Sequence, residues 1–267
     1  MSNVPPFDFT AFMRSLPQNP GKWTKTYEQE IINRADKRIS VLKDRLEGVV
    51  QGRVMPDLDQ VTIGSAKQFR LAVLFMDICG FSGWKNWTSD EQKTVLAIMN
   101  IFMTEMINIA RDFNGSFEKN TGDGFMAYFG AEAATDAERV KVAVEAATVM
   151  HYINDVHISP FLERNGCWKI RFRVGIDLGP VTIARVGIRG QANSIVAIGT
   201  PANIACKLMK LIPDGGICIG DDVYRALPNN WTSSCTACDQ SSGFVYVANN
   251  APYLAWKLDY RLTRPTL

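Results

Sequence analysis

Residues 69–82 have the sequence FRLAVLFMDICGFS, and this stretch decides the fold. Its first eight residues are almost wholly apolar, which is typical of a strand that is covered on both faces. Asp77 follows directly, and an ionised carboxylate beside a buried strand is costly unless it is paired, caps a helix or binds a metal. The turn after it offers backbone amides that can face an anion. The stretch therefore predicts a central strand that ends in a polar site.

The elements after this strand are predicted in the order helix, hairpin, helix, hairpin, helix. Capping boxes at Ser89/Gln92 and at Thr135/Glu138 mark the starts of the first two helices, and Asn114-Gly115 ends the first. The predicted ranges are 90–113, 116–120 with 125–129, 135–154, 168–178 with 181–186 turned at Gly179-Pro180, and 201–211. Two further strands are expected around 244–247 and 254–258. This order predicts an α+β fold of the ferredoxin-like or palm type, in which helices pack on an antiparallel-rich sheet.

The segment before the central strand is of a different kind. Residues 1–22 are predicted to form an irregular arm, and residues 26–50 a helix. The apolar residues of this helix are spaced alternately three and four apart, a seam that suits packing either on its own domain or against a second subunit. They are Ile32, Ala35, Ile39, Leu42, Leu46 and Val49. Residues 52–68 have the composition of a linker. We therefore divide the chain into an N-terminal arm, helix and linker (1–68) and a domain (69–267).

Composition excludes several classes of function. The net charge is +2, and residues 69–267 carry equal numbers of acidic and basic side chains, so duplex nucleic acid is not an expected partner. We see no secretory signal and no apolar run long enough for a membrane helix, which predicts a cytoplasmic protein with reduced thiols. Cys235 and Cys238 form a pair, but zinc needs two more ligands and none is obvious nearby. His151 and His157 are the only histidines, so any chemistry is expected to rest on carboxylates and a bound metal.

Asp77 and Asp123 are the carboxylates that suit such chemistry. Asp123 lies between two glycines at the tip of the 116–129 hairpin, and in a palm topology that hairpin lies beside the first strand. The two carboxylates then converge and can hold two Mg²⁺ or Mn²⁺ ions, one activating a hydroxyl and one neutralising a triphosphate. The alternative is that Asp77 caps a helix and Asp123 only fills a turn.

Four segments, taken together and in order, resemble the class III nucleotidyl cyclase catalytic domain over residues 69–227. They are FMDICGFS (75–82), KNTGDGFMAYFG (119–130), FRVGIDLGPV (172–181) and AIGTPANIACKL (197–208). The resemblance implies attack of a ribose 3′-hydroxyl on the α-phosphate of a nucleoside triphosphate, with release of pyrophosphate. It also implies a head-to-tail homodimer whose active sites are shared between subunits.

The resemblance also implies roles for individual residues. Asp77 and Asp123, with the Ile78 carbonyl, match the metal ligands. Phe81 and Ser82 match the turn whose amides hold the triphosphate. Arg173 matches the phosphate-binding arginine, whose guanidinium suits bidentate contact, although a solvated charge at a strand end is its alternative role. On the segment 197–208, Asn203 matches the asparagine that positions the ribose.

Three departures from the family pattern bear on the substrate. Lys119 stands where a lysine usually accompanies adenine, but its partner position holds Val196, which cannot hydrogen-bond a base. Lys207 replaces the transition-state arginine, a role that Arg185 or Arg189 can take instead. A Lys-Gly-Lys segment that holds the triphosphate in many members is missing, and among the C-terminal strands only Lys257 can replace it.

An N-terminal helix ahead of a lone cyclase domain with altered base-reading residues looks like the pyrimidine cyclases of the Pycsar anti-phage defence system. That similarity implies synthesis of cyclic UMP, or next cyclic CMP, which a separate effector senses. Two alternatives stay open, namely an adenylate cyclase, favoured by Lys119, and a weak cyclase-homology regulatory module, favoured by Lys207. The neutral catalytic region disfavours a polymerase, and no Gly-Gly-Asp-Glu-Phe signature points to cyclic dinucleotide synthesis.

Overall fold

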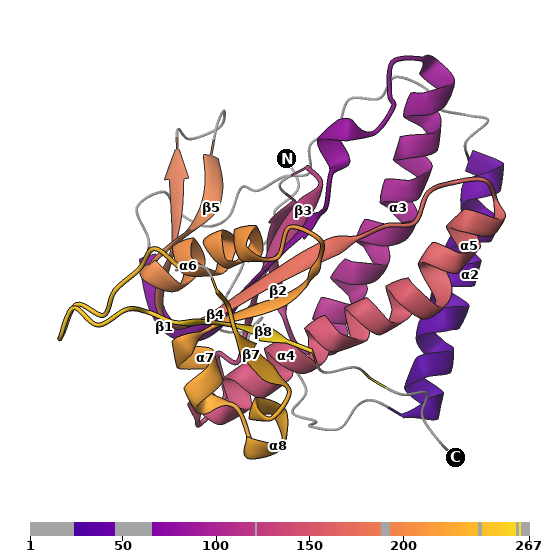
Figure 1. Cartoon of the computed structure of the whole chain (residues 1–267). Coiled ribbons are helices and arrows are strands. Elements are labelled where there is room, and N and C mark those ends of the chain that lie inside the picture. The colour runs from indigo at the N-terminus through magenta and orange to yellow at the C-terminus, as the bar shows by residue number, and fades with distance from the viewer. Residues whose placement is uncertain are drawn as a thin grey trace, which may run out of the picture.

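A computed structural model describes residues 24–45, 66–120, 122–187, 193–239, 242–259 and 262. Its centre is a mixed sheet of eight strands in the order β2-β3-β1-β4-β6-β8-β7, with β5 also paired to β4 (Figure 1). Among the described strands, only β4 and β6 pair in parallel. The strands are β1 (Ala66–Ile78), β2 (Ser116–Asn120), β3 (Gly124–Phe129), β4 (Phe172–Gly187), β5 (Asn193–Ile198), β6 (Gly216–Gly220), β7 (Cys235–Ala237) and β8 (Ala255–Leu258). The predicted α+β fold of helices packed on an antiparallel-rich sheet is confirmed.

Strand β1 is covered on both faces, as its composition predicts. Ala72, Leu74 and Met76 belong to the larger core, whereas Leu71 and Val73 belong to a second core on the opposite face. This division follows from the alternation of side chains along a strand. The strand is thus fixed from both sides, and so is the position of Asp77 near its end.

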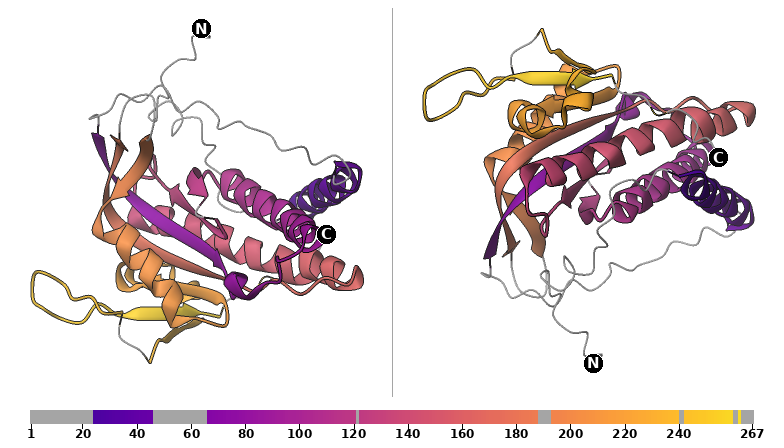
Figure 2. Two further views of the ribbon diagram at one scale, coloured as in Figure 1. Left: turned by 90° about the horizontal axis from the view of Figure 1, so that it is seen from above. Right: turned by 90° about the horizontal axis from the view of Figure 1, so that it is seen from below.

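Helices cover the two faces of the sheet unequally (Figure 2). The larger core lies under α3 and α4, and the smaller core lies under α6. The π-helical turn η3 and then α5 continue α4, and the turn η4 extends α6. The bounds of these helices are α3 (Ser89–Asp112), α4 (Asp136–Ile153), η3 (Asn154–Ile158), α5 (Ser159–Arg164), α6 (Thr200–Leu208) and η4 (Met209–Leu211). The short helices α7 (Asp221–Ala226) and α8 (Asn229–Thr232) follow β6.

Helix α3 begins one residue earlier than its predicted capping box implied. Thr88 accepts the Glu91 amide at 3.2 Å, and the Glu91 carboxylate accepts the Thr88 amide at 2.9 Å. The prediction of Ser89 and Gln92 is therefore wrong. Both pairs satisfy the spacing, but the Glu91 carboxylate also interacts favourably with the positive end of the helix. The Thr135/Glu138 box of α4 is confirmed.

The predicted hairpin at Gly179-Pro180 is wrong, because β4 runs without interruption from Phe172 to Gly187. It pairs with β1 along its length, from Ile78 opposite Phe172 to Ala66 opposite Ala184. On its other side it pairs with β6 up to Ile176 and with β5 from Thr182 onward. Proline is tolerated in a strand where one side has no partner, and Pro180 lies in that gap.

The C-terminal strands differ in part from the prediction. Strand β8 confirms the one expected near 254–258, but residues 244–247 form only an isolated bridge, between Val245 and Pro252. Pro252 has no amide hydrogen to continue a ladder. The edge strand beside β8 is instead β7.

The N-terminal helix α2 (Lys25–Arg45) packs on its own domain through the part whose side chains are described. Tyr27, Ile31 and Ala35 are buried, and Arg34 bonds both Glu105 and Asp112 of α3 at 3.2 and 2.6 Å. Figure 2 shows α2 lying beside α3. Residues 46–50 of the predicted helix and most of the linker lie outside the described residues, and β1 already begins at Ala66.

Helix α3 is long and apolar enough to cross a membrane by length and composition alone. Half of its most apolar window is buried inside the fold, and Ile98, Phe102 and Met106 on that side pack into the larger core. That packing is typical of a core helix.

Candidate active site

The site is built where three strands meet at one end of the sheet. Asp77, the last but one residue of β1, lies opposite Gly124 of β3 on one side and opposite Arg173 of β4 on the other. The hairpin tip is fixed to β1 because the Ile78 amide donates to the Asp123 carbonyl at 3.0 Å. The tertiary structure therefore brings Asp77, Ile78, Asp123 and Arg173 together, as the sequence predicted for the two aspartates.

Arg173 makes an ion pair with Asp77. Its Nη2 and Nε atoms donate to Oδ2 of Asp77 at 2.6 and 3.1 Å, and both side chains are mostly buried. The other carboxylate oxygen, Oδ1, lies on the side of Gly124, where a Cβ would approach it to 3.2 Å. One oxygen of Asp77 is thus held by the arginine and the other faces the Asp123 hairpin.

Gly124 makes this arrangement possible. A Cβ at this position would lie 2.2 Å from the Met76 carbonyl oxygen, closer than side-chain atoms approach backbone. Only glycine lets β3 come so near to β1 without a shift of one strand. The Gly-Asp-Gly sequence of the hairpin tip was the signal of this close approach.

The surroundings of Asp123 disfavour the ionised form of its carboxyl. Partial burial raises the pKa of Asp123, and the negative charge of Asp77 raises it further, whereas the Asp123 backbone and the Arg173 charge lower it. A cation bound beside Asp123 would favour its ionised form. The donor set of Asp77, Asp123 and a backbone carbonyl therefore fits a hard, oxygen-binding ion such as Mg²⁺.

The predicted triphosphate turn is present as a single 3₁₀ turn, η2 (Phe81–Gly83). The Phe81 ring packs on Trp84, and Trp84 packs on Trp168, with ring centroids 4.9 and 5.2 Å apart. Ser82 is exposed. These aromatic contacts, which hold the turn, were not predicted. The chain just before the turn is held as well, because the Cys79 amide donates to the Arg171 carbonyl at 2.8 Å.

The residues assigned to the ribose and transition state lie on α6. Asn203 and Lys207 are exposed one turn apart, and the Lys207 ammonium lies 4.4 Å from the centre of the Phe244 ring. Within the described part of the chain, neither residue is bonded to Asp77, Asp123 or Arg173.

The base-reading positions are only partly described. Val196 is half-buried on β5 opposite Ala184, and the backbone of Lys119 lies on β2 opposite Met126. The side chains of Lys119 and Arg185, and all of Arg189, lie outside the described residues. Lys257 pairs with Asp259 at 3.5 Å and lines a cavity that does not include Asp77 or Asp123.

The fold and the site together define a nucleotidyl cyclase catalytic domain. The family model of the adenylate and guanylate cyclase catalytic domain matches residues 65–243, and the chain belongs to this family.

Several curated relatives act on pyrimidine nucleotides by name. The chain is 32% identical over 168 residues to a uridylate cyclase of Burkholderia cepacia, a match that spans 59% of this chain and 67% of that protein. It is 28% identical over 166 residues to a cytidylate cyclase of Staphylococcus aureus, spanning 60% of this chain but only 38% of that protein. The chain thus matches less than half the length of the latter.

Solved structures share the fold. The adenylyl cyclase CyaB from P. aeruginosa superposes with a TM-score of 0.59 at 23% identity, covering 74% of this chain and 97% of that one. The guanylyl cyclase Cya2 gives a TM-score of 0.60 at 18% identity, with 74% and 94% coverage.

Proposed function

We propose that this protein cyclises a pyrimidine nucleoside triphosphate, UTP before CTP, to the 3′,5′-cyclic nucleotide with release of pyrophosphate. The observation that carries the proposal is the convergence of Asp77, Asp123 and Arg173 at one end of β1. Carboxylates for a metal next to a guanidinium for phosphate are the groups that phosphoryl transfer needs.

Asp77, Asp123 and the Ile78 carbonyl would hold Mg²⁺ or Mn²⁺, two ions per site. Among the described residues no group of three or more His, Cys, Asp or Glu side chains forms a metal cage. This agrees with Mg²⁺, which is held by one or two carboxylates, with waters and substrate phosphates as its other ligands. When bound, the ions would lower the pKa of the 3′-hydroxyl and neutralise the triphosphate.

Arg173 is the residue that changes partner when substrate binds. A triphosphate offers its guanidinium two oxygens for a bidentate contact, whereas Asp77 accepts both hydrogen bonds at the single oxygen Oδ2. Its transfer to the phosphate would release Oδ2 of Asp77 and place a positive charge beside the leaving pyrophosphate. The η2 turn would supply backbone amides to the same phosphates.

A homodimer would complete the site. Asn203 and Lys207 are exposed on α6, where a second subunit can reach them. This supports two shared sites, in which one subunit supplies the aspartates and its partner the ribose-binding asparagine.

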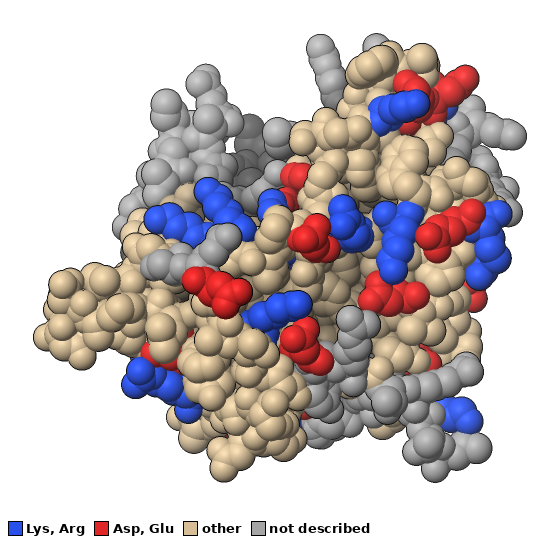
Figure 3. Space-filling view, in the orientation of Figure 1, with Lys and Arg blue, Asp and Glu red and all other residues tan. Residues whose placement is uncertain are grey.

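The pyrimidine assignment is supported by Val196 and by the names of the relatives. A valine offers no hydrogen bond to an adenine amino group. Uridylate and cytidylate cyclases are among the similar proteins. The resemblance to the Pycsar cyclases further leads us to propose a cytoplasmic enzyme that makes a second messenger for anti-phage defence, which a separate effector senses. The face shown in Figure 3 intersperses acidic and basic side chains, which supports a mononucleotide rather than a nucleic acid as substrate.

The test is incubation of the purified protein with each of the four nucleoside triphosphates and Mn²⁺, followed by mass spectrometry of the products. We expect cyclic UMP, with less cyclic CMP, and no product from the Asp77→Ala variant. Exclusive cyclisation of ATP would favour the adenylate cyclase alternative, on which Lys119 bears. No product from any of the four would leave the regulatory module as the better assignment.

A further inference from the structure

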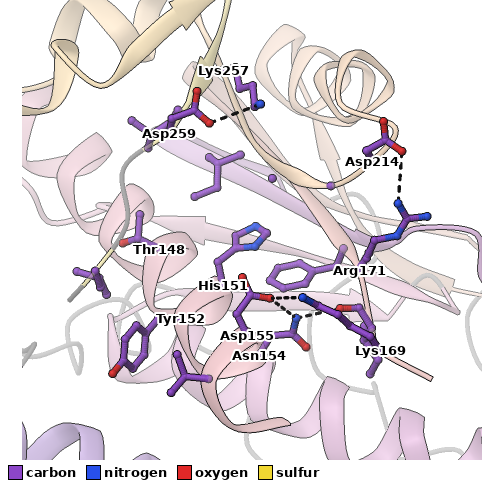
Figure 4. A pocket seen from close by; sticks show the side chains of 18 residues that line it. Thr148, His151, Tyr152, Asn154, Asp155, Lys169, Arg171, Asp214, Lys257 and Asp259 are labelled. Atoms are coloured by element: carbon purple, nitrogen blue, oxygen red, sulfur yellow. Dashed lines mark hydrogen bonds and ion pairs between the residues drawn. The ribbon is translucent and has the colours of Figure 1, made fainter. Parts of the chain in front are cut away.

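A cavity of about 370 Å³ lies where α4 ends and β4 and β6 begin (Figure 4). The end of β8 closes its remaining side. Asp77, Asp123 and Arg173 are not among its lining residues. Its volume is that of cavities that bury a small molecule.

Aromatic side chains form the inner wall of this cavity. The His151 ring stacks on the buried Phe172 ring with centroids 4.0 Å apart and planes 11° apart, and Tyr152 lines another part of the cavity. Figure 4 shows the His151 ring in the middle of the cavity lining. The aromatic wall suits a flat, unsaturated ligand.

Three ion pairs surround the opening (Figure 4). They join Lys169 to Asp155 at 3.8 Å, Arg171 to Asp214 at 3.4 Å, and Lys257 to Asp259 at 3.5 Å. These distances are long beside the 2.6 Å between Arg173 and Asp77. Exposed pairs of this kind contribute little to folding, so a ligand can replace one partner at small cost.

The anionic partners are the ones that a ligand would replace. The Asp214 side chain is 91% exposed against 59% for Arg171, and that of Asp259 is 55% exposed against 49% for Lys257. In these two pairs the acid is the more exposed partner, whereas in the third pair Lys169 is 51% exposed and Asp155 45%. A negatively charged group that enters the cavity therefore meets Arg171 and Lys257.

The backbone around the cavity is held in uncommon conformations. The turn η3 is π-helical, a form that concentrates at functional sites, and buried Asn154 and Ser159 tie it to the Ile170 carbonyl at 2.9 and 3.3 Å. On the other side Gly215 and Gly216 have φ angles of +104° and +113°, which favour glycine and leave bare backbone at the wall. The cavity is thus preformed.

We propose that this cavity binds a small aromatic anion, with its ring against His151, which the buried Phe172 backs, and its charged group between Arg171 and Lys257. The site is separate from the proposed cyclase site but adjoins it along β4. Arg171 and Phe172 directly precede Arg173, and Gly216 lies opposite Arg173 in the ladder between β6 and β4. An occupant therefore contacts the residues next to the arginine that bonds Asp77.

Binding is tested by fluorescence titration of the full chain with 8-anilinonaphthalene-1-sulfonate. The neutral probe N-phenyl-1-naphthylamine, which has the same rings without the sulfonate, is titrated in parallel. Arg171→Gln and Lys257→Gln should each weaken binding of the sulfonate about tenfold, the loss of one charge-assisted hydrogen bond. Asp214→Asn should tighten it about threefold by freeing Arg171. The neutral probe should respond to none of these changes.

Matched controls come from the exposed pair of Asp90 and Lys93 on α3, whose side chains are 93% and 50% exposed. Asp90→Asn and Lys93→Gln change the net charge by the same amounts far along the chain from the cavity, and should leave the affinity unchanged. Equal affinity in the wild type, Arg171→Gln and Lys257→Gln would overturn the proposal. Equal effects in the α3 pair would overturn it as well.

The coupling to the active site is tested separately, and this arm rests on the proposed cyclase function. Saturating sulfonate probe should change nucleotide turnover of the wild type at least about twofold, and the same probe concentration should affect Lys257→Gln less. An identical response in both proteins would show that the probe acts elsewhere. A protein without turnover would instead count against the proposed function, while the titrations would still decide the binding site.

Discussion

Arg173 donates two hydrogen bonds to a single carboxylate oxygen of Asp77, from the neighbouring strand of the sheet. The pair joins the residue expected to bind phosphate to the residue expected to bind metal. In this structure the arginine bonds the carboxylate that the proposed metal would use. Under the proposed function, substrate binding and metal binding would be coupled through this contact.

Replacing Arg173 should therefore change metal binding and turnover in opposite directions. We expect Arg173→Gln to bind Mn²⁺ about threefold more tightly in the absence of nucleotide, because a competing cation is removed. The same variant should lose roughly 10²–10³-fold in kcat/KM, since a bidentate phosphate contact is gone. Calorimetric titration with Mn²⁺ and steady-state kinetics measure the two effects. Arg171→Gln, which removes the same charge two residues away, is the control for metal affinity, and weaker Mn²⁺ binding by Arg173→Gln would contradict the prediction.

Gly124→Ala should separate β3 from β1. The added Cβ cannot coexist with the Met76 carbonyl 2.2 Å away, so we expect a loss of about 2–4 kcal/mol in the free energy of unfolding, measured in urea. Gly83→Ala is the matched control, because nothing lies within 4 Å of its Cβ and its φ is not in the left-handed region. It should change stability by less than about 0.5 kcal/mol. Equal stability of the two variants would show that the strands are not in close contact.

Two adjacent isoleucines of α2 should differ in importance. Ile31 is fully buried against the domain, whereas Ile32 is partly exposed. We expect Ile31→Ala to lower the free energy of unfolding by about 3 kcal/mol and Ile32→Ala by less than about 1 kcal/mol. Thermal and urea unfolding measure the difference. The reverse order would mean that the predicted seam through Ile32, and not the Ile31 face, holds the helix.

Asp177 should make the protein less stable as the pH rises. Burial raises the pKa of this carboxyl well above its usual range, against the lowering effect of a hydrogen bond from Tyr253. The folded state therefore keeps a proton that the unfolded state releases above about pH 4. Between these two pKa values the unfolded state binds fewer protons, so stability is full below the unfolded pKa and falls by at most about 1.4 kcal/mol per pH unit above it.

Asp177→Asn removes this loss while it preserves an acceptor for Tyr253. Its stability relative to the wild type should increase between pH 5 and 7, measured by urea unfolding at each pH, as the titration of one carboxyl requires. Asp214→Asn, at a side chain that is 91% exposed, should follow the wild type. A constant difference between Asp177→Asn and the wild type would show that Asp177 does not titrate in this range.

Val196→Asp should shift base preference if β5 contributes to the base site. An aspartate accepts the hydrogen bond of an adenine amino group that valine cannot, so the ratio of ATP to UTP turnover should rise about tenfold. Competition assays with both nucleotides measure this ratio. Val245→Asp, at an exposed residue outside β5, is the charge-matched control. An unchanged ratio in Val196→Asp would place the base elsewhere.

The sequence by itself determined the central strand, the order of most elements and the two aspartates. This information came from local signals. A long apolar run indicates a strand covered on both faces, a capping box indicates a helix start, and Gly-Asp-Gly between two strands indicates a hairpin. Thr88 and Ser89 both begin a possible capping box, and the predicted N-cap of α3 was therefore one residue too late. Gly179-Pro180 suggested a turn, but Pro180 lies within β4, where one side of the strand has no partner, and no turn is formed.

Only the tertiary structure decided which residues meet. The pairing of Asp77 with Arg173 depends on the register of β1 against β4, and a shift of one residue would turn the arginine to the opposite face. Register is set by the packing of both cores at once, which no single segment encodes. The same holds for His151, an isolated histidine in the sequence that acquires Phe172 and three ion pairs around it only when α4, β4 and β8 come together.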